Sequence, residues 1–458
     1  MKKYTHIILG AGQATGTLIG KLAGTGDSIA VIEGKKVGGS CVNYGCTPTK
    51  TLVAAAKAIY TARQGDLYGF STGQEVKVNF QEVYTRMNKV RVESRDGLRD
   101  MLKNTENVEL IEGWGVFTSE KTLQVGDRKI EGENIYINVG TSANMPDFEG
   151  IHEVTALDSA GLLAIDELPK HLLILGGGYI GIEYAQIFRR LGSEVTIIQR
   201  DQQLMPREDE DVATAIQDFL EKEGIEVLLE TNVQKAKKTA RGLALTIERA
   251  DVISTLSGSH FLVAIGRHPN TERLDLAAAG IKTDDKGYIQ VDDHCRTNVD
   301  GVFAVGDVNG EGAFTHTSVN DAEIVLDYLL HDGNRKISDR TTIYGLFTDP
   351  PLGRIGMSEK EARESGRTIK MATHPMNKIS RAKEMGQTKG FAKLLVDAET
   401  DLIVGASILG IGGDEVINMF AAIIHSRIPC RKYREVVLVH PTVSELMPFV
   451  LDGLEELR

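Results

Sequence analysis

Two cysteines near the start of the chain, Cys41 and Cys46, have the types and spacing that best suit chemistry, with four residues between them. The alanine-rich stretch Thr51 to Ala62 follows and predicts a helix that begins near Cys46. A thiol at a helix N-terminus has a lowered pKa, because the helix dipole stabilises the thiolate. With Cys41 in the loop before that helix, the two sulfurs can come within disulfide range, so the pair is a candidate redox centre.

Two other interpretations of the pair stay open from the spacing alone. The cysteines could form half of a metal site, or they could be two unrelated buried thiols. Zinc would need two further ligands, whereas the other cysteines, Cys295 and Cys430, are isolated in the sequence. We expect no metal, and we interpret Cys295, Cys430 and His268 as structural residues.

The length and composition bound the class of protein. A chain of 458 residues with 41% hydrophobic residues can build about three domains. A net charge of −12 argues against a nucleic-acid surface and against binding to an anionic membrane. The chain starts Met1-Lys2-Lys3 and runs into a short strand without a signal-peptide core, and no apolar run is long enough to span a bilayer. We therefore expect a cytoplasmic protein, in which a disulfide is catalytic rather than structural.

The chain opens with the pattern of a dinucleotide-binding unit. The strand Tyr4 to Leu9 leads into a glycine turn, a helix, a second strand and then Glu33. Gly10 permits the tight turn, Gly12 lets a pyrophosphate approach the backbone, and Glu33 is placed to bind both hydroxyls of an adenosine ribose. Thr15 stands where a third glycine is usual, which predicts a looser or shifted contact between helix and strand.

A second unit of this kind follows the strand His171 to Leu175. Gly176, Gly178 and Gly181 have full G-x-G-x-x-G spacing and open a helix that runs to Leu191. Two fingerprints in one chain are more specific than one, and they indicate two bound nucleotides. A flavin and a nicotinamide are the pair that this combination implies.

The nicotinamide preference depends on the end of the strand Glu194 to Ile198. That strand ends in Gln199-Arg200, with no acid in the usual ribose position. Arg200, helped by Arg207, could hold a 2′-phosphate instead, so NADPH is the predicted cofactor. The alternative is that Arg200 is only a surface charge and that NADH binds.

Further candidates lie at the ends of later strands. A strand from Phe261 leads into Gly266 and Arg267, and a strand from Val302 ends in Gly306-Asp307, where the aspartate could bind a ribityl hydroxyl or lie near the phosphates. Thr315 opens a helix whose amides could face a flavin carbonyl. From about Thr341 the pattern changes to a separate α+β domain. Near its end, His440 precedes Glu445 at a spacing that suits either an oriented acid–base pair or a structural histidine before a helix.

Together these motifs resemble the pyridine nucleotide–disulfide oxidoreductases, which include glutathione reductase, dihydrolipoamide dehydrogenase and mercuric reductase. The central motif runs from Gly39 to Lys50, and the resemblance covers nearly the whole chain. It implies an α/β fold with two Rossmann-like domains, for FAD and NAD(P), plus a C-terminal α+β dimerisation domain. The expected FAD domain is 1–149 with 268–340, the NAD(P) domain 150–267, and the interface domain 341–458. The resemblance also adds to the cofactor-binding candidates Gly39, Ser40, Gly115 and Gly140.

The resemblance also implies roles for the catalytic residues. Cys46 would be the sulfur against the flavin and Cys41 the thiol that exchanges with substrate. His440 would move the proton of Cys41 in the partner subunit of a homodimer, with Glu445 orienting its imidazole.

Four other residues receive roles from the same resemblance. Lys50 would sit by the flavin and pair with Glu183, and Tyr179 would be the aromatic gate over the flavin. Pro441 would follow a cis peptide bond. The predicted activity is therefore hydride transfer from NAD(P)H to FAD and on, through the cysteine pair, to a disulfide substrate.

Two observations limit the choice within the family. Mercuric reductase carries a C-terminal cysteine pair, whereas this sequence ends Gly453-Leu454-Glu455-Glu456-Leu457-Arg458. Dihydrolipoamide dehydrogenase fits His440 and Glu445, but Gln199-Arg200 does not suit its NAD preference. We therefore keep it as the first alternative, and a non-catalytic flavin-bound redox sensor as the second. The substrate itself is left open as a low-molecular-weight or protein disulfide.

Overall fold

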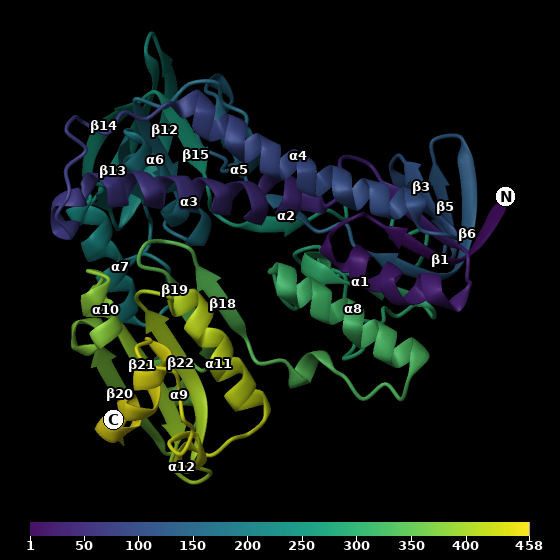
Figure 1. Ribbon diagram of the computed structural model, residues 1–458. Helices are drawn as coiled ribbons and strands as arrows, with labels where there is room; N and C mark the ends of the chain where they lie inside the picture. The colour runs from purple at the N-terminus through teal and green to yellow at the C-terminus, as the bar shows by residue number, and fades with distance from the viewer. Residues whose placement is uncertain (458) are drawn as a thin grey trace.

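The structure, a computed structural model, describes residues 1–457 and divides into three bodies, each built on its own large sheet (Figure 1). The expected fold class, two nucleotide-binding α/β units followed by an α+β unit, is confirmed. No helix within residues 1–457 is long and apolar enough to cross a membrane. The domain boundaries stay a prediction, and we keep them as the working division because each predicted domain contains one of these sheets.

The first sheet has seven strands in the order β3-β2-β1-β6-β5-β4, with β17 paired to β6. Strands β1, β2, β3, β6 and β17 pair in parallel, whereas β4, β5 and β6 form an antiparallel meander. Since β17 is more than 160 residues from β6, two distant parts of the chain build one domain. The strands are β1 (Lys2–Leu9), β2 (Ile29–Glu33), β3 (Val108–Glu112), β4 (Gly115–Ser119), β5 (Thr122–Val125), β6 (Arg128–Ile137) and β17 (Val302–Ala304).

Helices from both parts of the chain cover this sheet. The helix α1 lies beside α8 in Figure 1, and α3 packs against α4. The long apolar strands are buried on both faces, as parallel sheets require, with Ile7, Ile8 and Val31 fully inaccessible to solvent. The helices are α1 (Gln13–Leu22), α2 (Gly39–Tyr44), α3 (Cys46–Arg63), α4 (Phe80–Asn104) and α8 (Thr315–Leu330).

The second body is a five-stranded parallel sheet in the order β11-β10-β9-β15-β8. Its helix α6 packs against α3, so the two nucleotide units meet beside the cysteine motif. The elements are β8 (Ala156–Leu157), α5 (Ser159–Leu162), β9 (His171–Leu175), α6 (Tyr179–Leu191), β10 (Glu194–Ile198), α7 (Glu210–Lys222), β11 (Glu226–Leu228) and β15 (His260–Val263).

Two smaller sheets were not expected from the sequence. The strand β7 (Thr141–Ala143) pairs antiparallel with β16 (Arg267–Pro269). The crossovers into and out of the second body therefore run side by side. The strands β12 (Thr231–Thr239), β13 (Gly242–Arg249) and β14 (Val252–Gly258) form an antiparallel sheet that covers the second body.

The third body is an antiparallel sheet of six strands in the order β18-β19-β22-β21-β20-β23, with α11 across one face (Figure 1). Its strands are β18 (Ile343–Leu346), β19 (Leu352–Gly356), β20 (Ile369–Pro375), β21 (Phe391–Asp397), β22 (Leu402–Leu409) and β23 (Glu455–Glu456). Its helices are α9 (Glu359–Glu364), α10 (Ser380–Glu384), α11 (Gly413–His425), α12 (Cys430–Tyr433) and α13 (Met447–Val450).

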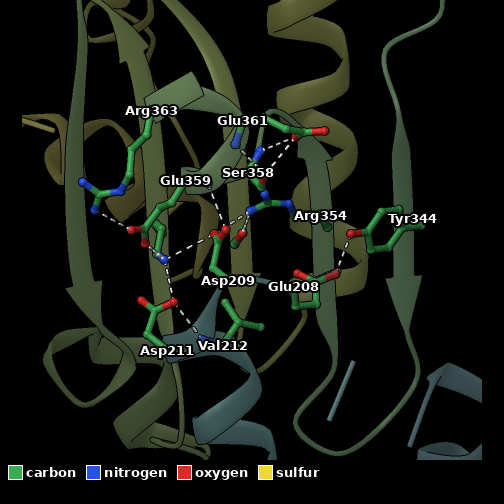
Figure 2. Close-up of polar contacts among 12 residues, drawn as sticks. Glu208, Asp209, Asp211, Val212, Tyr344, Arg354, Ser358, Glu359, Glu361 and Arg363 are labelled. Carbon is green, nitrogen blue, oxygen red and sulfur yellow. Dashed lines mark hydrogen bonds and ion pairs between the residues drawn. The ribbon is translucent and has the colours of Figure 1, made fainter. Parts of the chain in front are cut away.

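Buried charges join the second and third bodies. Asp209 and Arg354 are each 3% exposed and lie 3.1 Å apart (Figure 2). Lys393, 1% exposed, binds Asp209 as well as Asp211 and Glu359. These three carboxylates lie close enough together to hold a cation, and the Lys393 ammonium occupies the space between them.

Candidate active site

The two cysteines lie in consecutive helices rather than in a loop and a helix. The expectation for Cys41 was wrong: it belongs to α2, whereas Cys46 is the first residue of α3 as predicted. The short helix forms because the side-chain amide of Asn43 donates to the carbonyls of Val37 and Gly39, both at 2.9 Å. Only Gly45 separates the two helices, so both sulfurs face one another.

The electrostatic environment favours a protonated thiol at one of the two cysteines and a thiolate at the other. Both are free thiols in the structure. A hydrogen bond from Cys41 lowers the pKa of Cys46 to about 6, helped by Thr315 and the positive charge of Lys50. The same contact with Cys46 raises the pKa of Cys41, and burial raises it further. Cys46 is therefore the thiolate and Cys41 the thiol that donates to it.

Two helix N-termini contribute to that thiolate. No side chain caps α3, so the N–H groups of Cys46 and Thr47 at its start have no side-chain acceptor. Thr315, the first residue of α8, places its hydroxyl oxygen 3.6 Å from the sulfur of Cys46. By contrast, burial raises the pKa of Cys295 and raises that of Cys430 to about 12, so these two thiols are inert.

Lys50 and Glu183 form the ion pair that the resemblance implied. The Lys50 ammonium lies 3.0 and 2.7 Å from the two carboxylate oxygens of Glu183. Glu183 is 6% exposed and also accepts the backbone N–H of Phe347 from the third body. The ammonium lies 4.5 Å from the Phe347 ring. One turn of α3 thus separates a cysteine thiolate from a positively charged, fixed lysine.

The first fingerprint has the geometry of a dinucleotide site. Gly10 adopts a φ of +101°, and a Cβ there would lie 2.4 Å from the carbonyl oxygen of Asn138. Glu33 accepts the backbone N–H of Ala11 at 2.9 Å, which places the acid beside the turn. Gly39 lies against Gly12, because its Cβ would be 3.1 Å from the Gly12 Cα. The cysteine helix α2 is therefore seated on the nucleotide turn, with Ser40 exposed next to it.

Thr15 does not loosen this unit, contrary to expectation. Its side chain is 3% exposed, and its hydroxyl donates to the Gly10 carbonyl at 3.0 Å. The Asn138 amide donates to the same hydroxyl at 3.1 Å. In the second fingerprint the matching residue is Gly181, whose Cβ would lie 2.1 Å from the Gly176 carbonyl. A hydrogen bond in one half thus replaces a close backbone contact in the other.

The second fingerprint has an open side at Gly178. Gly176 has a φ of +110°, whereas a Cβ at Gly178 would meet nothing within 4 Å. Tyr179 starts α6 and donates from its hydroxyl to Glu208 at 3.1 Å. The N-termini of both α1 and α6 lack a side-chain cap, whereas Asn79, Asp158 and Ser358 cap α4, α5 and α9. Free amides at these two helix starts fit the pyrophosphates of two dinucleotides.

The region of the predicted ribose contact contains an acid that the sequence analysis missed. Gln199 is buried and accepts the Gly177 N–H at 3.0 Å, the role that Glu33 has in the first unit. Its amide donates to Asp201 at 2.6 Å. Arg200 is 81% exposed and lies 3.9 Å from Asp201. The site thus has an exposed cation and a neighbouring carboxylate.

The later glycine turns meet at the end of the first sheet. Asp307 accepts the hydroxyl of Thr141 at 2.8 Å, and Arg267 donates to the same hydroxyl at 2.7 Å. Arg267 and Asp307 were expected from the sequence. Thr141 was not, because it belongs to no motif. Four candidates take up turn or packing positions here: Gly140 and Gly306 with φ of +65° and +72°, Gly266 with φ of +109°, and Gly115 against Leu9.

His440 and Glu445 form a hydrogen-bonded pair away from the cysteines. The Nδ1 atom of His440 lies 2.9 and 3.0 Å from the two carboxylate oxygens of Glu445, which leaves Nε2 free. The peptide bond before Pro441 is cis, as expected. The His440 side chain is 75% exposed, and no hydrogen bond within residues 1–457 joins it to Cys41 or Cys46.

Comparison with known proteins places these features in one family. The sequence profile of the pyridine nucleotide-disulphide oxidoreductases matches residues 4–322, and the profile of their dimerisation domain matches residues 343–449. The chain belongs to the pyridine nucleotide-disulphide oxidoreductase family. It is thus an oxidoreductase, and the family implies FAD and a pyridine nucleotide as cofactors.

Curated relatives cover almost the whole chain. The probable pyridine nucleotide-disulfide oxidoreductase RclA of Escherichia coli (strain K12) is 37% identical over 97% of this chain and 98% of its own. A mercuric reductase of Staphylococcus aureus is 31% identical over 90% and 76% of the two chains. A dihydrolipoyl dehydrogenase of the same organism is 29% identical over 96% and 94%.

Solved structures show the same fold. The HOCl-induced flavoprotein disulfide reductase RclA from Escherichia coli has a TM-score of 0.89 at 35% identity, over 98% of this chain and 99% of its own. The chain is thus similar to this reductase over nearly its whole length, in agreement with the two family profiles. Three residues of the site were not expected from the sequence, because they belong to no local motif: Thr141, Asp201 and Glu208.

Proposed function

We propose that the protein reduces a disulfide substrate with electrons from NADPH, through FAD and the Cys41–Cys46 pair. The observation that supports this most directly is the division of the pair into a Cys46 thiolate, with a pKa of about 6, and a Cys41 thiol. When bound, FAD supplies the two-electron chemistry that connects hydride transfer to thiol chemistry. The residues that would hold it are those at the uncapped start of α1, together with Glu33, Asp307 and Thr315.

The cysteines then carry out two exchange steps. Cys41, once deprotonated, attacks one sulfur of the substrate disulfide, which forms a mixed disulfide and releases the first thiol. Cys46, already a thiolate, attacks the Cys41 sulfur, which releases the second thiol and closes the Cys41–Cys46 disulfide. Two electrons and two protons are used for each substrate disulfide. Lys50, held by Glu183, keeps a positive charge beside Cys46 throughout.

His440 supplies the acid–base step from a partner subunit. Its Nε2 atom takes the proton of Cys41 and returns it to the leaving thiol, while Glu445 fixes the ring. The exposure of His440 supports a homodimer, as do its neighbours Val437 and Val439, which are 95% and 76% exposed. We infer that this segment is covered by a second copy, whose Cys41 it serves.

The choice of NADPH depends on Arg200. No acid occupies the position of Gln199, and the exposed Arg200 guanidinium suits a 2′-phosphate. Asp201 argues for NADH, because a carboxylate near that position repels a phosphate and accepts ribose hydroxyls. NADH is therefore the specific alternative, as in the dihydrolipoamide dehydrogenase reading.

An anaerobic stopped-flow titration with NADPH and, separately, NADH tests the proposal. We expect a long-wavelength charge-transfer band between the Cys46 thiolate and the flavin after two electrons, sooner with NADPH. The Cys46→Ser variant is the matched control, in which the flavin is reduced without that band and disulfide turnover is lost. Flavin reduction without the band in the unaltered protein would remove the cysteines from the electron path. A faster response to NADH would assign the ribose site to Asp201.

A further inference from the structure

One buried carboxylate links the Tyr179 side chain to the third body of the molecule. Glu208 lies just before α7 and is 6% exposed. Its Oε1 atom accepts the hydroxyl of Tyr179 at 3.1 Å. The same atom accepts the hydroxyl of Tyr344 on β18 (Figure 2). The three side chains come from α6, from the segment before α7 and from β18. A single oxygen therefore connects the second fingerprint to the interface domain.

The two tyrosine rings form a cluster with Phe314, which precedes α8. The Tyr179 ring lies edge-on to Tyr344 at 5.4 Å between centroids, and edge-on to Phe314 at 6.4 Å. Phe314 and Tyr344 stack at 5.6 Å. The next residue after Phe314 is Thr315, whose hydroxyl reaches Cys46. The Tyr179 ring thus contacts Phe314, whose neighbour Thr315 contacts the redox pair.

The hydrogen bonding of Glu208 is uneven. Two donors share Oε1, whereas Oε2 is buried and has no hydrogen-bond partner within residues 1–457. Burial raises the pKa of Glu208, and the hydroxyl of Tyr344 and the charge of Arg354 oppose that rise. A carboxylate held in this way is stabilised mainly by its two phenol donors. Loss of the Tyr344 donor would raise the pKa of Glu208 further, and a protonated Glu208 accepts the Tyr179 hydroxyl less strongly.

Resting on the proposed function, in which Tyr179 covers the flavin until nicotinamide displaces it, we propose that Glu208 and Tyr344 form a latch on that gate. In the closed state Glu208 holds the Tyr179 hydroxyl. Access of nicotinamide requires this one bond to break, while Tyr344 keeps Glu208 in place on the interface domain. Glu208 and Tyr344 are thus positioning residues: they control how readily the gate opens and touch neither cofactor.

The latch predicts a specific kinetic pattern in the FAD-loaded protein. Tyr179→Phe, Glu208→Gln and Tyr344→Phe each weaken the closed state, so the apparent Kd for nicotinamide falls about threefold to tenfold. The limiting rate of flavin reduction stays the same in Glu208→Gln and Tyr344→Phe, because neither of these two side chains belongs to the gate itself or to the reacting atoms. Tyr344→Phe acts in the same direction because a carboxylate with one donor fewer is more readily protonated and then accepts less strongly.

Anaerobic stopped-flow flavin reduction over a range of nicotinamide concentrations tests this, with Tyr84→Phe as the control. Tyr84 is also buried and loses one hydroxyl bond, to the Leu162 carbonyl at 2.9 Å, but it lies outside the cluster. The double variant Tyr179→Phe/Glu208→Gln should change the apparent Kd no more than Tyr179→Phe alone, since Tyr179→Phe already removes the bond that Glu208→Gln weakens. A purely structural role would give additive effects.

The outcomes separate the latch from the proposed function. If the unaltered flavoprotein is not reduced by either nicotinamide, the proposed function is wrong, and the latch with it. If it is reduced normally and the apparent Kd does not change in Tyr179→Phe and Tyr344→Phe, the latch alone is wrong. Additive effects in the double variant would also overturn it. The tyrosine variants keep their rings, so the test does not depend on whether Glu208→Gln folds.

Discussion

At the scale of single residues, the chemistry depends on one thiolate and on the charges around it. Cys46 is stabilised by the Cys41 thiol, by the Thr315 hydroxyl and by the Lys50 ammonium, while burial and Glu183 act against it. The contributions have opposite signs and known sources. Each can therefore be removed singly, and the direction of the effect on Cys46 follows from electrostatics.

The first prediction concerns the pH dependence of Cys46. Its pKa of about 6 in the folded dithiol protein lies below the ordinary value of 9.0. The thiolate is therefore present above about pH 6, and the stability that it contributes is complete above the unfolded pKa and is lost as the pH falls through 6. Iodoacetamide should modify Cys46 in the anaerobically reduced protein with a midpoint near pH 6, as followed by mass spectrometry.

The Thr315→Val variant should move this midpoint upward, because it removes a hydroxyl 3.6 Å from the sulfur. Thr51→Val is the matched control, since the Thr51 hydroxyl bonds the Thr47 carbonyl. Modification of Cys41 ahead of Cys46 would reverse our assignment of thiol and thiolate.

A second prediction uses the Lys50–Glu183 pair, whose two charges act on Cys46 with opposite signs. Lys50→Met should raise the pKa of Cys46, because the nearby positive charge is lost. Glu183→Gln should lower it, because a negative charge is lost and Lys50 stays. The thiolate absorbance of the reduced protein, titrated in both variants, measures the two shifts. Shifts of the same sign in both variants would show that the pair acts through packing rather than charge.

At the scale of elements, the two nucleotide units use the same turn with one difference. Each begins with a glycine of positive φ against the carbonyl of a neighbouring strand, at Gly10 and Gly176. Helix α6 then approaches its strand through Gly181, whereas α1 is held through the Thr15 hydroxyl. The sequence rule of a third glycine thus describes one way to seat the helix, and a buried hydroxyl is another.

The third prediction tests this seating with Gly181→Ala. The added Cβ would lie 2.1 Å from the Gly176 carbonyl oxygen, so α6 must shift away from the turn. We expect a loss of about 1–3 kcal/mol in the free energy of unfolding and weaker nicotinamide binding. Gly20→Ala on α1 is the control, because a Cβ there meets nothing within 4 Å and alanine favours a helix. Denaturant unfolding of both variants with FAD present measures the difference, and equal stabilities would contradict the seating.

At the scale of the whole molecule, charged groups decide how the bodies are joined. Arg190 on α6, which is 3% exposed, binds both Glu223 and Asp349, and the latter belongs to the third body. Between α6 and α7, Asp209 binds Arg354 and Lys393 of the third body. Buried ion pairs of this kind fix a relative position even where they add little net stability. They hold the interface domain, and with it Tyr344, against the nicotinamide unit.

The fourth prediction follows from these buried ion pairs between the second and third bodies. Lys393→Met leaves the buried Asp209 with Arg354 as its remaining ion-pair partner and Glu359 with Arg363 alone, which should cost about 3–5 kcal/mol in the free energy of unfolding. Lys432→Met removes an exposed pair with Glu435, 62% and 64% exposed, and should change little. Thermal unfolding of the flavoprotein compares the two. If the thermal unfolding of Lys393→Met is unchanged, the ion pairs of Lys393 do not contribute to the stability of the protein.

The fifth prediction addresses the dimer. If His440 serves Cys41 of the partner subunit, the Cys41→Ser and His440→Ala homodimers should both lack disulfide turnover. Mixed dimers of the two contain one complete site, so a statistical mixture should recover about a quarter of the original activity. The disulfide turnover is measured after the two variant subunits are co-expressed, because mixed dimers form only when both subunits are present. Mixed dimers without activity would place the acid–base pair and the thiol in the same subunit.

The sequence by itself was enough for the parts that local patterns encode. The strands β9 and β10 have the bounds read from their apolar runs, and α3 and α8 begin at the predicted residues. The glycine turns and the cysteine motif were also readable, because a tight turn or a helix start needs particular residue types at particular spacings. The family, and with it the class of reaction, follows from these local features in their order.

Only the tertiary structure decided which charges and hydroxyls meet. Thr141, Asp201 and Glu208 belong to no motif, and they reach Asp307, Gln199 and the two tyrosines only because distant segments pack together. The antiparallel sheet β12-β13-β14 and the helix at Cys41 escaped detection as well, since polar strands and a six-residue helix have weak periodicity. The hydrogen bonds and the positive charge brought together at Cys46 outweigh burial, which by itself would raise its pKa, whereas burial raises the pKa of Glu208 and the Tyr344 hydroxyl opposes that rise.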